Sequence, residues 1–213
     1  MNIAVLVFNG VELVDMNGPL DVFLHANRFN IAPFYNVYTV AATPGPIISE
    51  GGVVTIVPQY TFETCPDPEL IVIPGRIGND ADSTSIPAKP EVVEYVRQMA
   101  GKGKLILSVC VGLYTLAETG LLAGRKATTH YLAIDYVESH YKGIDMIKNV
   151  RYVHDDNFIT TGGITSGIDG ALYVVEQYNG PDVALKVANI MVYNREAALP
   201  PGTILPLHDQ SAS

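Results

Sequence analysis

One cysteine has the sequence surroundings of a catalytic nucleophile. Cys110 directly follows an apolar, β-prone run, 105–109, and directly precedes an apolar-periodic segment that predicts a helix ending at Gly120. A thiol at such a strand-to-helix corner lies beside free backbone N–H groups and the positive end of a helix dipole, and both favour the thiolate. Hydrolases use the same corner, with serine, as a nucleophile elbow. The alternative is a small buried hydrophobic residue, because free cysteine is among the most buried residue types.

Two other loops carry residues that could act together with this cysteine. Asp15 comes after the first predicted strand, 3–8, and Gly75 and Arg76 follow a second buried strand, 70–73. Ligands of open α/β sheets bind outside the carboxyl ends of the strands, so we expect these loops to meet. Asp15 would then serve as a general acid, because a carboxyl buried beside a thiolate can stay protonated. Its alternative role is that of a hydrogen-bond acceptor at a turn or helix start.

Three more groups would complete a catalytic pocket. The backbone N–H groups of Arg76 and Val111 could stabilise a developing negative charge, as in an oxyanion hole. The Arg76 guanidinium could bind a substrate carboxylate or cover its loop in solvent. His130 precedes a predicted helix and is the candidate for a Cys–His pair, or else a satisfied buried histidine. Val111, directly after the cysteine, cannot act as a base.

Composition limits the class of protein. The 213 residues are 48% hydrophobic and 16% charged, which is typical of a compact globular chain, and no linker divides them. We therefore predict one domain over 1–198, followed by a Pro-rich tail, 199–213. A net charge of −9 with scattered basic residues argues against a nucleic-acid partner.

The cysteines and histidines predict neither a disulfide framework nor a metal site, because their spacing fits no ligand pattern. The glycine-rich stretch 161–167 lacks a phosphate-loop or dinucleotide register, so we expect no cofactor. The first apolar run is too short to span a membrane. A free thiol without an export signal predicts a reducing cytoplasm.

Strands alternate with helices along the chain, which predicts a doubly wound α/β sandwich with a mostly parallel sheet. Besides the strands above, the pattern predicts strands at 35–42 and 52–58 and a hairpin at 150–154 and 158–161. Helices are expected from near Pro19, at 90–101, 113–120 and 131–141, after the glycine-rich stretch, and at 181–193.

The order of several motifs resembles the DJ-1/PfpI superfamily (class I glutamine amidotransferase-like), in the branch that contains isonitrile hydratases and domains of AraC-type regulators. The resemblance runs through nearly the whole chain, in segments 5–23, 71–75, 108–112, 120–124, 127–130 and 159–169. It implies a flavodoxin-like fold, a homodimer, and an acidic residue of the first loop touching the cysteine, which is Asp15. Isonitrile hydratases add water to an isocyanide to give an N-substituted formamide, and we expect that activity on a small-molecule substrate.

Two positions depart from this branch. Val111 stands where isonitrile hydratases usually carry threonine and PfpI-type proteases carry histidine. Arg76 stands where the loop usually has glycine, and its bulk could narrow the pocket or select an anion. The alternatives are a non-catalytic sensor that binds a ligand or oxidises Cys110, and a glyoxalase or amidase activity of Cys110 with His130. AraC-type regulators continue into a DNA-binding domain, whereas this chain ends at Ser213.

Overall fold

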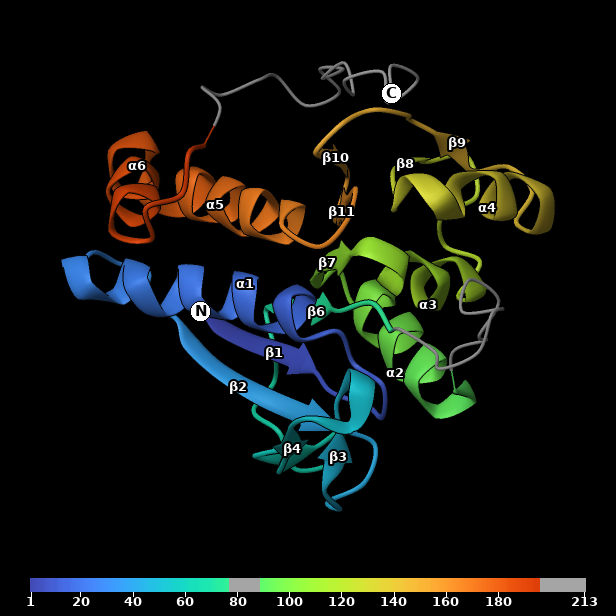
Figure 1. The fold of residues 1–213 in the computed structure, drawn as a ribbon, viewed down its shortest axis with the longest axis horizontal. Helices are drawn as coiled ribbons and strands as arrows, with labels where there is room; N and C mark the ends of the chain where they lie inside the picture. Colours follow the sequence, from blue (N-terminus) through green and yellow to red (C-terminus); the bar gives the residue numbers. More distant parts are fainter. Residues whose placement is uncertain (77–88, 196–213) are drawn as a thin grey trace.

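The apolar runs of the sequence form a central sheet (Figure 1). The computed structural model describes residues 1–76 and 89–195, so the predicted end of the domain at 198 and the tail 199–213 lie outside the described part. The sheet order is β10-β11-β7-β6-β1-β2-β5; β10 and β11 pair antiparallel, and the other neighbours pair parallel. The strands are β1 (Asn2–Leu6), β2 (Asn36–Ala41), β5 (Tyr60–Thr61), β6 (Leu70–Ile73), β7 (Leu105–Val109), β10 (Tyr152–Asp155) and β11 (Phe158–Thr161). The predicted doubly wound, mostly parallel α/β fold is confirmed.

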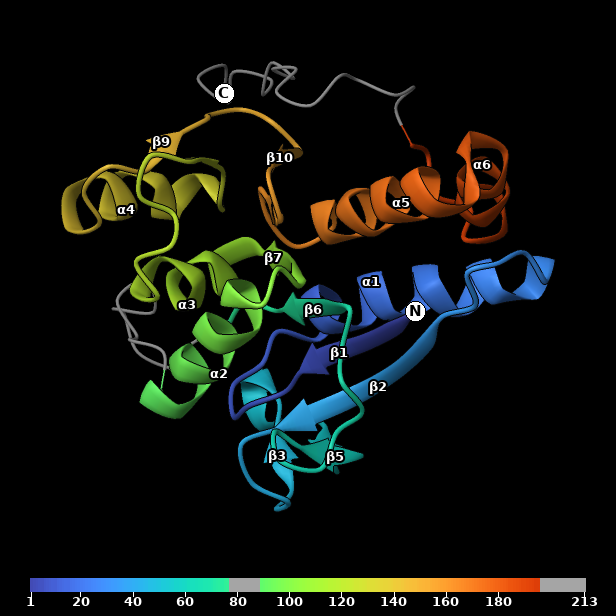
Figure 2. The same ribbon diagram turned by 180° about the vertical axis from the view of Figure 1, so that it is seen from behind.

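Helices cover both faces of this sheet, as Figures 1 and 2 show from opposite sides. One face carries α1 (Leu13–Ala26), α5 (Ser166–Asn179) and α6 (Pro181–Ile190); the other carries α2 (Pro90–Gly101), α3 (Leu113–Glu118) and α4 (Ile134–His140). Alternate residues of β1 enter the two cores: Ile3 and Val5 pack with the first set, Ala4 and Leu6 with the second. A strand buried on both faces has no polar alternation, which explains the continuous apolar run.

Short elements complete the described chain. Two small sheets pair β3 (Ile47–Ile48) with β4 (Thr55–Ile56) and β8 (Lys126–Ala127) with β9 (Asp145–Met146). Single 3-10 turns are η1 (Asn27–Phe29), η2 (Glu50–Gly52), η3 (Cys110–Gly112) and η4 (Tyr131–Ala133). None of the helices in the described ranges is long and apolar enough to cross a membrane.

The first helix begins earlier than the sequence predicts. It starts at Leu13 rather than near Pro19, and the proline lies inside the helix. Glu12 is the N-cap, and its carboxylate accepts a hydrogen bond from the backbone N–H of Asp15. Three other helices are shorter than predicted: α3 ends at Glu118, segment 131–141 is divided into η4 and α4, and α6 ends at Ile190.

The topology places three loops side by side. In the sheet β7, β6 and β1 are consecutive neighbours and run parallel, so the segments that follow them leave the same edge. These segments carry Cys110 after β7, Gly75 after β6 and Asp15 after β1. The candidate residues therefore come from adjacent carboxyl ends, as ligand sites of such sheets do.

Candidate active site

Cys110 lies on a strained strand-to-helix elbow. Its φ is +56°, in the left-handed region, where a residue other than glycine costs about 1–3 kcal/mol. The Thr129 hydroxyl donates to the Cys110 carbonyl at 2.7 Å, in a buried position. Gly112 allows the turn to approach β6, because a Cβ there would lie 2.2 Å from the Ile73 carbonyl oxygen. The strand-turn-helix geometry predicted for a nucleophile elbow is therefore present.

Asp15 and Cys110 meet across Gly75. The Asp15 side chain is fully buried, and its Oδ2 accepts from the Gly75 N–H at 2.8 Å. A Cβ on Gly75 would lie 2.6 Å from that Oδ2, 3.2 Å from the Cβ of Cys110 and 3.1 Å from Val111. Only a residue without a side chain fits between the Asp15 carboxyl and the Cys110 Cβ at this position. The three loops expected to converge lie together.

The electrostatics of the pair differ from the expectation for an isolated elbow. Burial raises the pKa of Asp15 to about 8, with the hydrogen bond and charge of Glu12 adding to it and the Gly75 N–H opposing it. Burial, followed by the charge of Asp15, raises the pKa of the Cys110 thiol to about 12. Backbone N–H groups of Val111 and Ile164 favour the thiolate, as expected at an elbow, but burial outweighs them. Both shifts favour the neutral forms, a thiol and a carboxylic acid.

Three residues of this site escaped the sequence analysis. Ile164, from the loop before α5, donates its N–H to the Cys110 sulfur. Glu12 and Glu50 act on the Asp15 carboxyl through hydrogen bonding or charge. Glu12 had a detectable signal, since it lies three residues before Asp15 and so on the same helical turn. No sequence signal pointed to Glu50, because it is distant from Asp15 along the chain and only the fold brings η2 to the start of α1.

The other predicted site residues lie near the elbow with separate contacts. Val111 supplies an N–H to the Cys110 sulfur, and its side chain is half-buried. Arg76 forms an antiparallel bridge with Val11 and is half-buried. A role for its N–H as an oxyanion donor stays a prediction.

His130 does not pair with the cysteine in the part of the chain described. Its ring packs against Gly163, where a Cβ would lie 2.6 Å from the ring carbon Cδ2. Its Nδ1 accepts from the Leu132 N–H at 3.4 Å, and partial burial lowers its pKa. Gly163 directly precedes Ile164, so His130 borders the loop that contacts the sulfur without contacting the sulfur itself.

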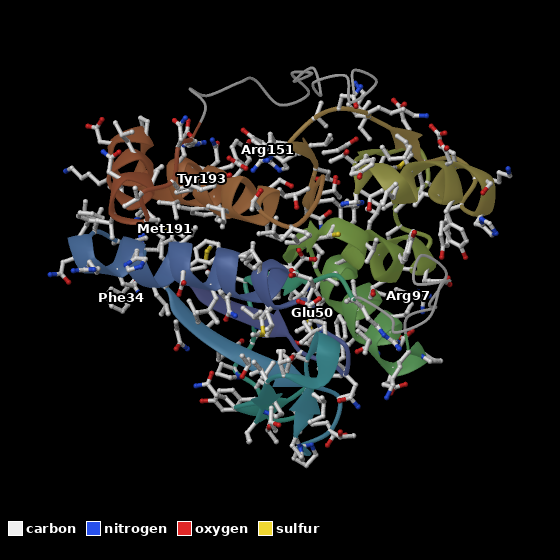
Figure 3. All side chains as sticks on the ribbon, viewed as in Figure 1. Phe34, Glu50, Arg97, Arg151, Met191 and Tyr193 are labelled. Atoms are coloured by element: carbon white, nitrogen blue, oxygen red, sulfur yellow. The ribbon has the colours of Figure 1, made fainter. Side chains whose placement is uncertain are left out.

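A hydrogen-bonded cluster anchors that loop. Arg151 donates to Asp169, in the first turn of α5, and to the Tyr193 hydroxyl at 2.5 Å. The Tyr193 hydroxyl also donates to Asp169 at 2.8 Å. Figure 3 labels Arg151 and Tyr193 on this side of the molecule. The Ser166 hydroxyl donates to the Gly163 carbonyl and accepts from the Gly163 N–H, both at 2.7 Å.

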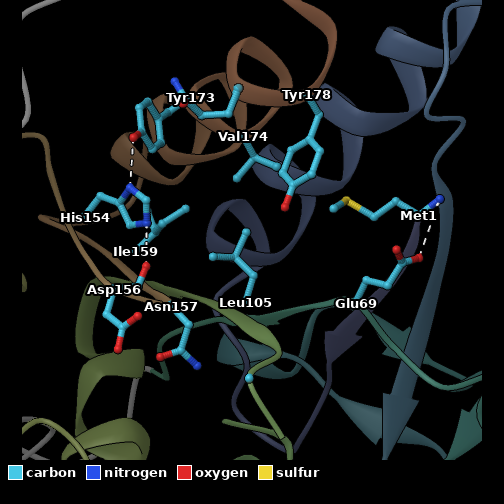
Figure 4. A pocket seen from close by; sticks show the side chains of 12 residues that line it. Met1, Glu69, Leu105, His154, Asp156, Asn157, Ile159, Tyr173, Val174 and Tyr178 are labelled. Carbon is cyan, nitrogen blue, oxygen red and sulfur yellow. Dashed lines mark hydrogen bonds and ion pairs between the residues drawn. The ribbon is translucent and has the colours of Figure 1, made fainter.

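A separate cavity of about 420 Å³ lies at the opposite end of the sheet (Figure 4). Glu69 before β6 and Leu105 at the start of β7 line it, so it opens at the amino ends of the strands. Its histidine, His154, already contacts the Tyr173 hydroxyl at 2.8 Å and the Asp156 carbonyl at 2.7 Å. Cys110 lies at the other end of the sheet. Across residues 1–76 and 89–195, no cluster of His, Cys, Asp or Glu is arranged to hold a metal ion.

The mostly parallel sheet covered by helices on both faces makes this a doubly wound α/β protein, and Cys110 and Asp15 lie at the carboxyl ends of its strands. The model of the DJ-1/PfpI family matches residues 1–177. The chain belongs to the DJ-1/PfpI family.

Curated relatives include both an enzyme and a regulator. The isonitrile hydratase of Pseudomonas putida is 33% identical over 184 residues, 86% of this chain and 75% of that protein. The HTH-type transcriptional regulator CdhR of Pseudomonas aeruginosa is 27% identical over 190 residues, and the match spans 89% of this chain but only 54% of the regulator.

Solved structures agree with the fold. A THiJ/PfpI family protein from Pseudomonas syringae superposes with a TM-score of 0.77 at 30% identity, over 95% of this chain and 78% of that one. DJ-1beta of Drosophila melanogaster superposes with a TM-score of 0.72 at 18% identity, over 91% of this chain and 98% of that one, which is a likeness of fold alone.

Proposed function

We propose that this protein is a cysteine-dependent isonitrile hydratase-like enzyme that adds water to a small isocyanide and releases an N-substituted formamide. One observation carries the proposal: a fully buried carboxyl, Asp15, and the elbow residue Cys110 flank Gly75 from opposite loops, close enough for the Asp15 charge to act on the thiol. The raised pKa of Asp15 keeps a proton donor near the Cys110 thiol. The 33% identity to an isonitrile hydratase supports this reaction over others of the family.

The neutral pair can carry out the addition without a net proton change. Asp15 protonates the terminal isocyanide carbon while the Cys110 sulfur bonds to that carbon, and the thiol proton passes to the Asp15 carboxylate. The product is a thioimidate, R–N=CH–S–Cys. Water then adds to the same carbon, its oxygen forming the new bond while Asp15 protonates the nitrogen and takes a proton from the water. Cleavage of the C–S bond returns a proton to sulfur and releases R–NH–CHO.

Because the Val111 side chain carries no proton donor, proton transfer in the proposed reaction falls to the Asp15 carboxyl. The threonine usual at this position in isonitrile hydratases would supply a hydroxyl, and valine supplies only its backbone N–H, which contacts the sulfur. The hydroxyl of Thr129 already bonds the Cys110 carbonyl. Asp15 is thus the proton donor that this proposal requires.

The test is formamide production from cyclohexyl isocyanide. Wild-type protein should form N-cyclohexylformamide, Cys110→Ala none, and Asp15→Asn at least about 100-fold less, the usual contribution of a general acid. Glu63→Gln, in an exposed turn, is the control and should match wild type. Absence of product from wild type, or equal product from Cys110→Ala, would refute the proposal.

The alternatives fit the site less well. A redox sensor needs an accessible thiolate, whereas Cys110 is 9% exposed and its pKa is raised. An amidase or glyoxalase that uses a Cys–His pair would need His130 to turn away from Gly163 toward the sulfur.

We also propose a homodimer. Exposed apolar side chains gather around the β3–β4 hairpin, with Val53 74% and Val57 71% exposed, together with Ile48 and Val54. Exposed apolar side chains gathered on one hairpin favour association with a second copy.

A further inference from the structure

An acid that must donate a proton at neutral pH needs surroundings that retain that proton. Resting on the hydratase proposal, we infer that Glu12 and Glu50 are positioning residues that hold a proton on Asp15 and keep it ready to donate. Neither glutamate touches the thiol, so neither is a catalytic residue. The inference rests on how three carboxyls are packed at the start of α1.

Glu12 joins the other two carboxyls. It is only 6% exposed, and its carboxylate accepts from the backbone N–H of Asp15 at 2.5 Å, which fixes the first turn of α1. Its charge and proximity raise the pKa of both Asp15 and Glu50. Like charges packed together disfavour ionisation, so the cluster favours the protonated form of Asp15.

Glu50 closes the cluster on the side nearer to solvent. It opens η2, and its backbone N–H donates to the Val11 carbonyl at 3.0 Å. Figure 3 labels it between η2 and α1. The side chain is half-buried, and burial with the charge of Glu12 raises its pKa.

Within residues 1–76 and 89–195, no Lys, Arg or His forms an ion pair with Glu12, Asp15 or Glu50. Arg76 follows Gly75 and bridges Val11 through its backbone, yet it forms no ion pair with the three acids in that part of the chain. The groups whose charge raises the pKa of Asp15 are Glu12 and Glu50, and Asp15 in turn raises the pKa of the Cys110 thiol.

The Asp15 carboxyl itself shows the consequence. Its Oδ1 is buried and receives no N–H or O–H hydrogen bond in the described structure. An ionised oxygen in that position would lose its hydration without compensation, which favours the protonated form. The glutamates add like charge to the same side, so the proton stays on Asp15.

The test is a direct titration of Asp15, independent of any substrate. Protein carrying ¹³C-labelled aspartate is followed by NMR, and the Asp15 carboxyl signal is assigned by its absence in Asp15→Asn. The wild-type signal should titrate near pH 8. Glu12→Gln and Glu50→Gln should each lower that midpoint by about one pH unit or more, because each removes a like charge. Glutamine at position 12 keeps an oxygen for the Asp15 N–H, so α1 retains its cap.

Activity gives the second readout. In the glutamine variants the alkaline limb of the kcat profile should move to lower pH by the same amount, with KM little changed, and Glu63→Gln should move neither quantity. Unchanged Asp15 midpoints in both glutamine variants, or a wild-type midpoint near the ordinary aspartate value, would overturn the inference. Failure of the hydratase proposal would appear differently, as absence of formamide from wild type with the NMR shifts intact.

Discussion

At the scale of single residues, the site depends on the absence of a side chain at Gly75. The Asp15 carboxylate and the Cys110 Cβ occupy the space that a methyl group at position 75 would need. The same closeness removes water from both groups, and burial is the main reason that both pKa values are raised. A neutral acid–thiol pair therefore follows from packing, whereas the elbow alone favours a thiolate.

The raised pKa of Asp15 predicts how stability depends on pH. Its folded value of about 8 exceeds the ordinary 3.8, so its contribution is fully present below 3.8 and is lost as pH rises through about 8. Each unit of that difference is worth about 1.4 kcal/mol. Asp15→Asn cannot ionise, so its free energy of unfolding should fall less between mildly acidic and mildly alkaline pH.

Urea unfolding at several pH values measures this dependence. Asp135→Asn is the control, because the Asp135 side chain is 97% exposed, and it should follow wild type. Parallel wild-type and Asp15→Asn curves across the range would show that Asp15 ionises normally in the folded protein.

At the scale of elements, two connections hold the elbow in its strained form. One is the segment after β8, through the Thr129 hydroxyl on the Cys110 carbonyl. The other is the loop before α5, through the Ile164 N–H on the sulfur. Ile164 itself has a φ of +23°, which is strained for a β-branched residue. The Arg151–Asp169–Tyr193 cluster ties that loop to the rest of the fold.

Removing the hydroxyl at position 129 should weaken the elbow. Thr129→Val keeps the shape but removes one of the two donors to the Cys110 carbonyl, the Leu113 N–H being the other, which should cost about 1 kcal/mol in the free energy of unfolding. Alkylation of Cys110 by iodoacetamide should change in rate, because the thiol is less firmly held. Thr129→Ser, which keeps the hydroxyl, should retain wild-type reactivity. If serine and valine behave alike, the hydrogen bond does not position the cysteine.

At the scale of the whole molecule, the sheet separates two ends with different properties. The carboxyl ends of β1, β6 and β7 carry the acid, the glycine and the thiol, while the cavity of Figure 4 opens at the amino ends. Beyond this layered body, the β3–β4 hairpin presents the exposed valines that we propose as the dimer surface.

Light scattering tests the dimer. Wild type at micromolar concentration should have twice the mass of one chain, and Val53→Asp should have a lower average mass, because a charge in an apolar interface is costly. Val192→Asp is the control, since Val192 is 92% exposed and lies outside the hairpin. A monomeric wild type would exclude the dimer, and an unchanged mass for Val53→Asp would place the interface elsewhere.

The sequence by itself determined the fold class and the elbow. Continuous apolar runs such as 105–109 mark strands buried on both faces, and the turn at Cys110 follows from the change of hydrophobic period directly after it. The sequence pattern placed the start of α1 too late, because proline is typical of a first helical turn and Pro19 therefore predicts the helix start. The N-cap is Glu12, a residue that in sequence is equally typical of an exposed surface.

Only the tertiary structure decided which groups act on the cysteine. It brought Asp15 and Gly75 against Cys110, added Glu50 and Ile164 from distant segments, and left His130 against Gly163. It also reversed the expected direction of the thiol pKa. The physical reason is that periodicity and local signals act over a few residues, whereas burial and contacts between loops depend on how strands are ordered in the sheet.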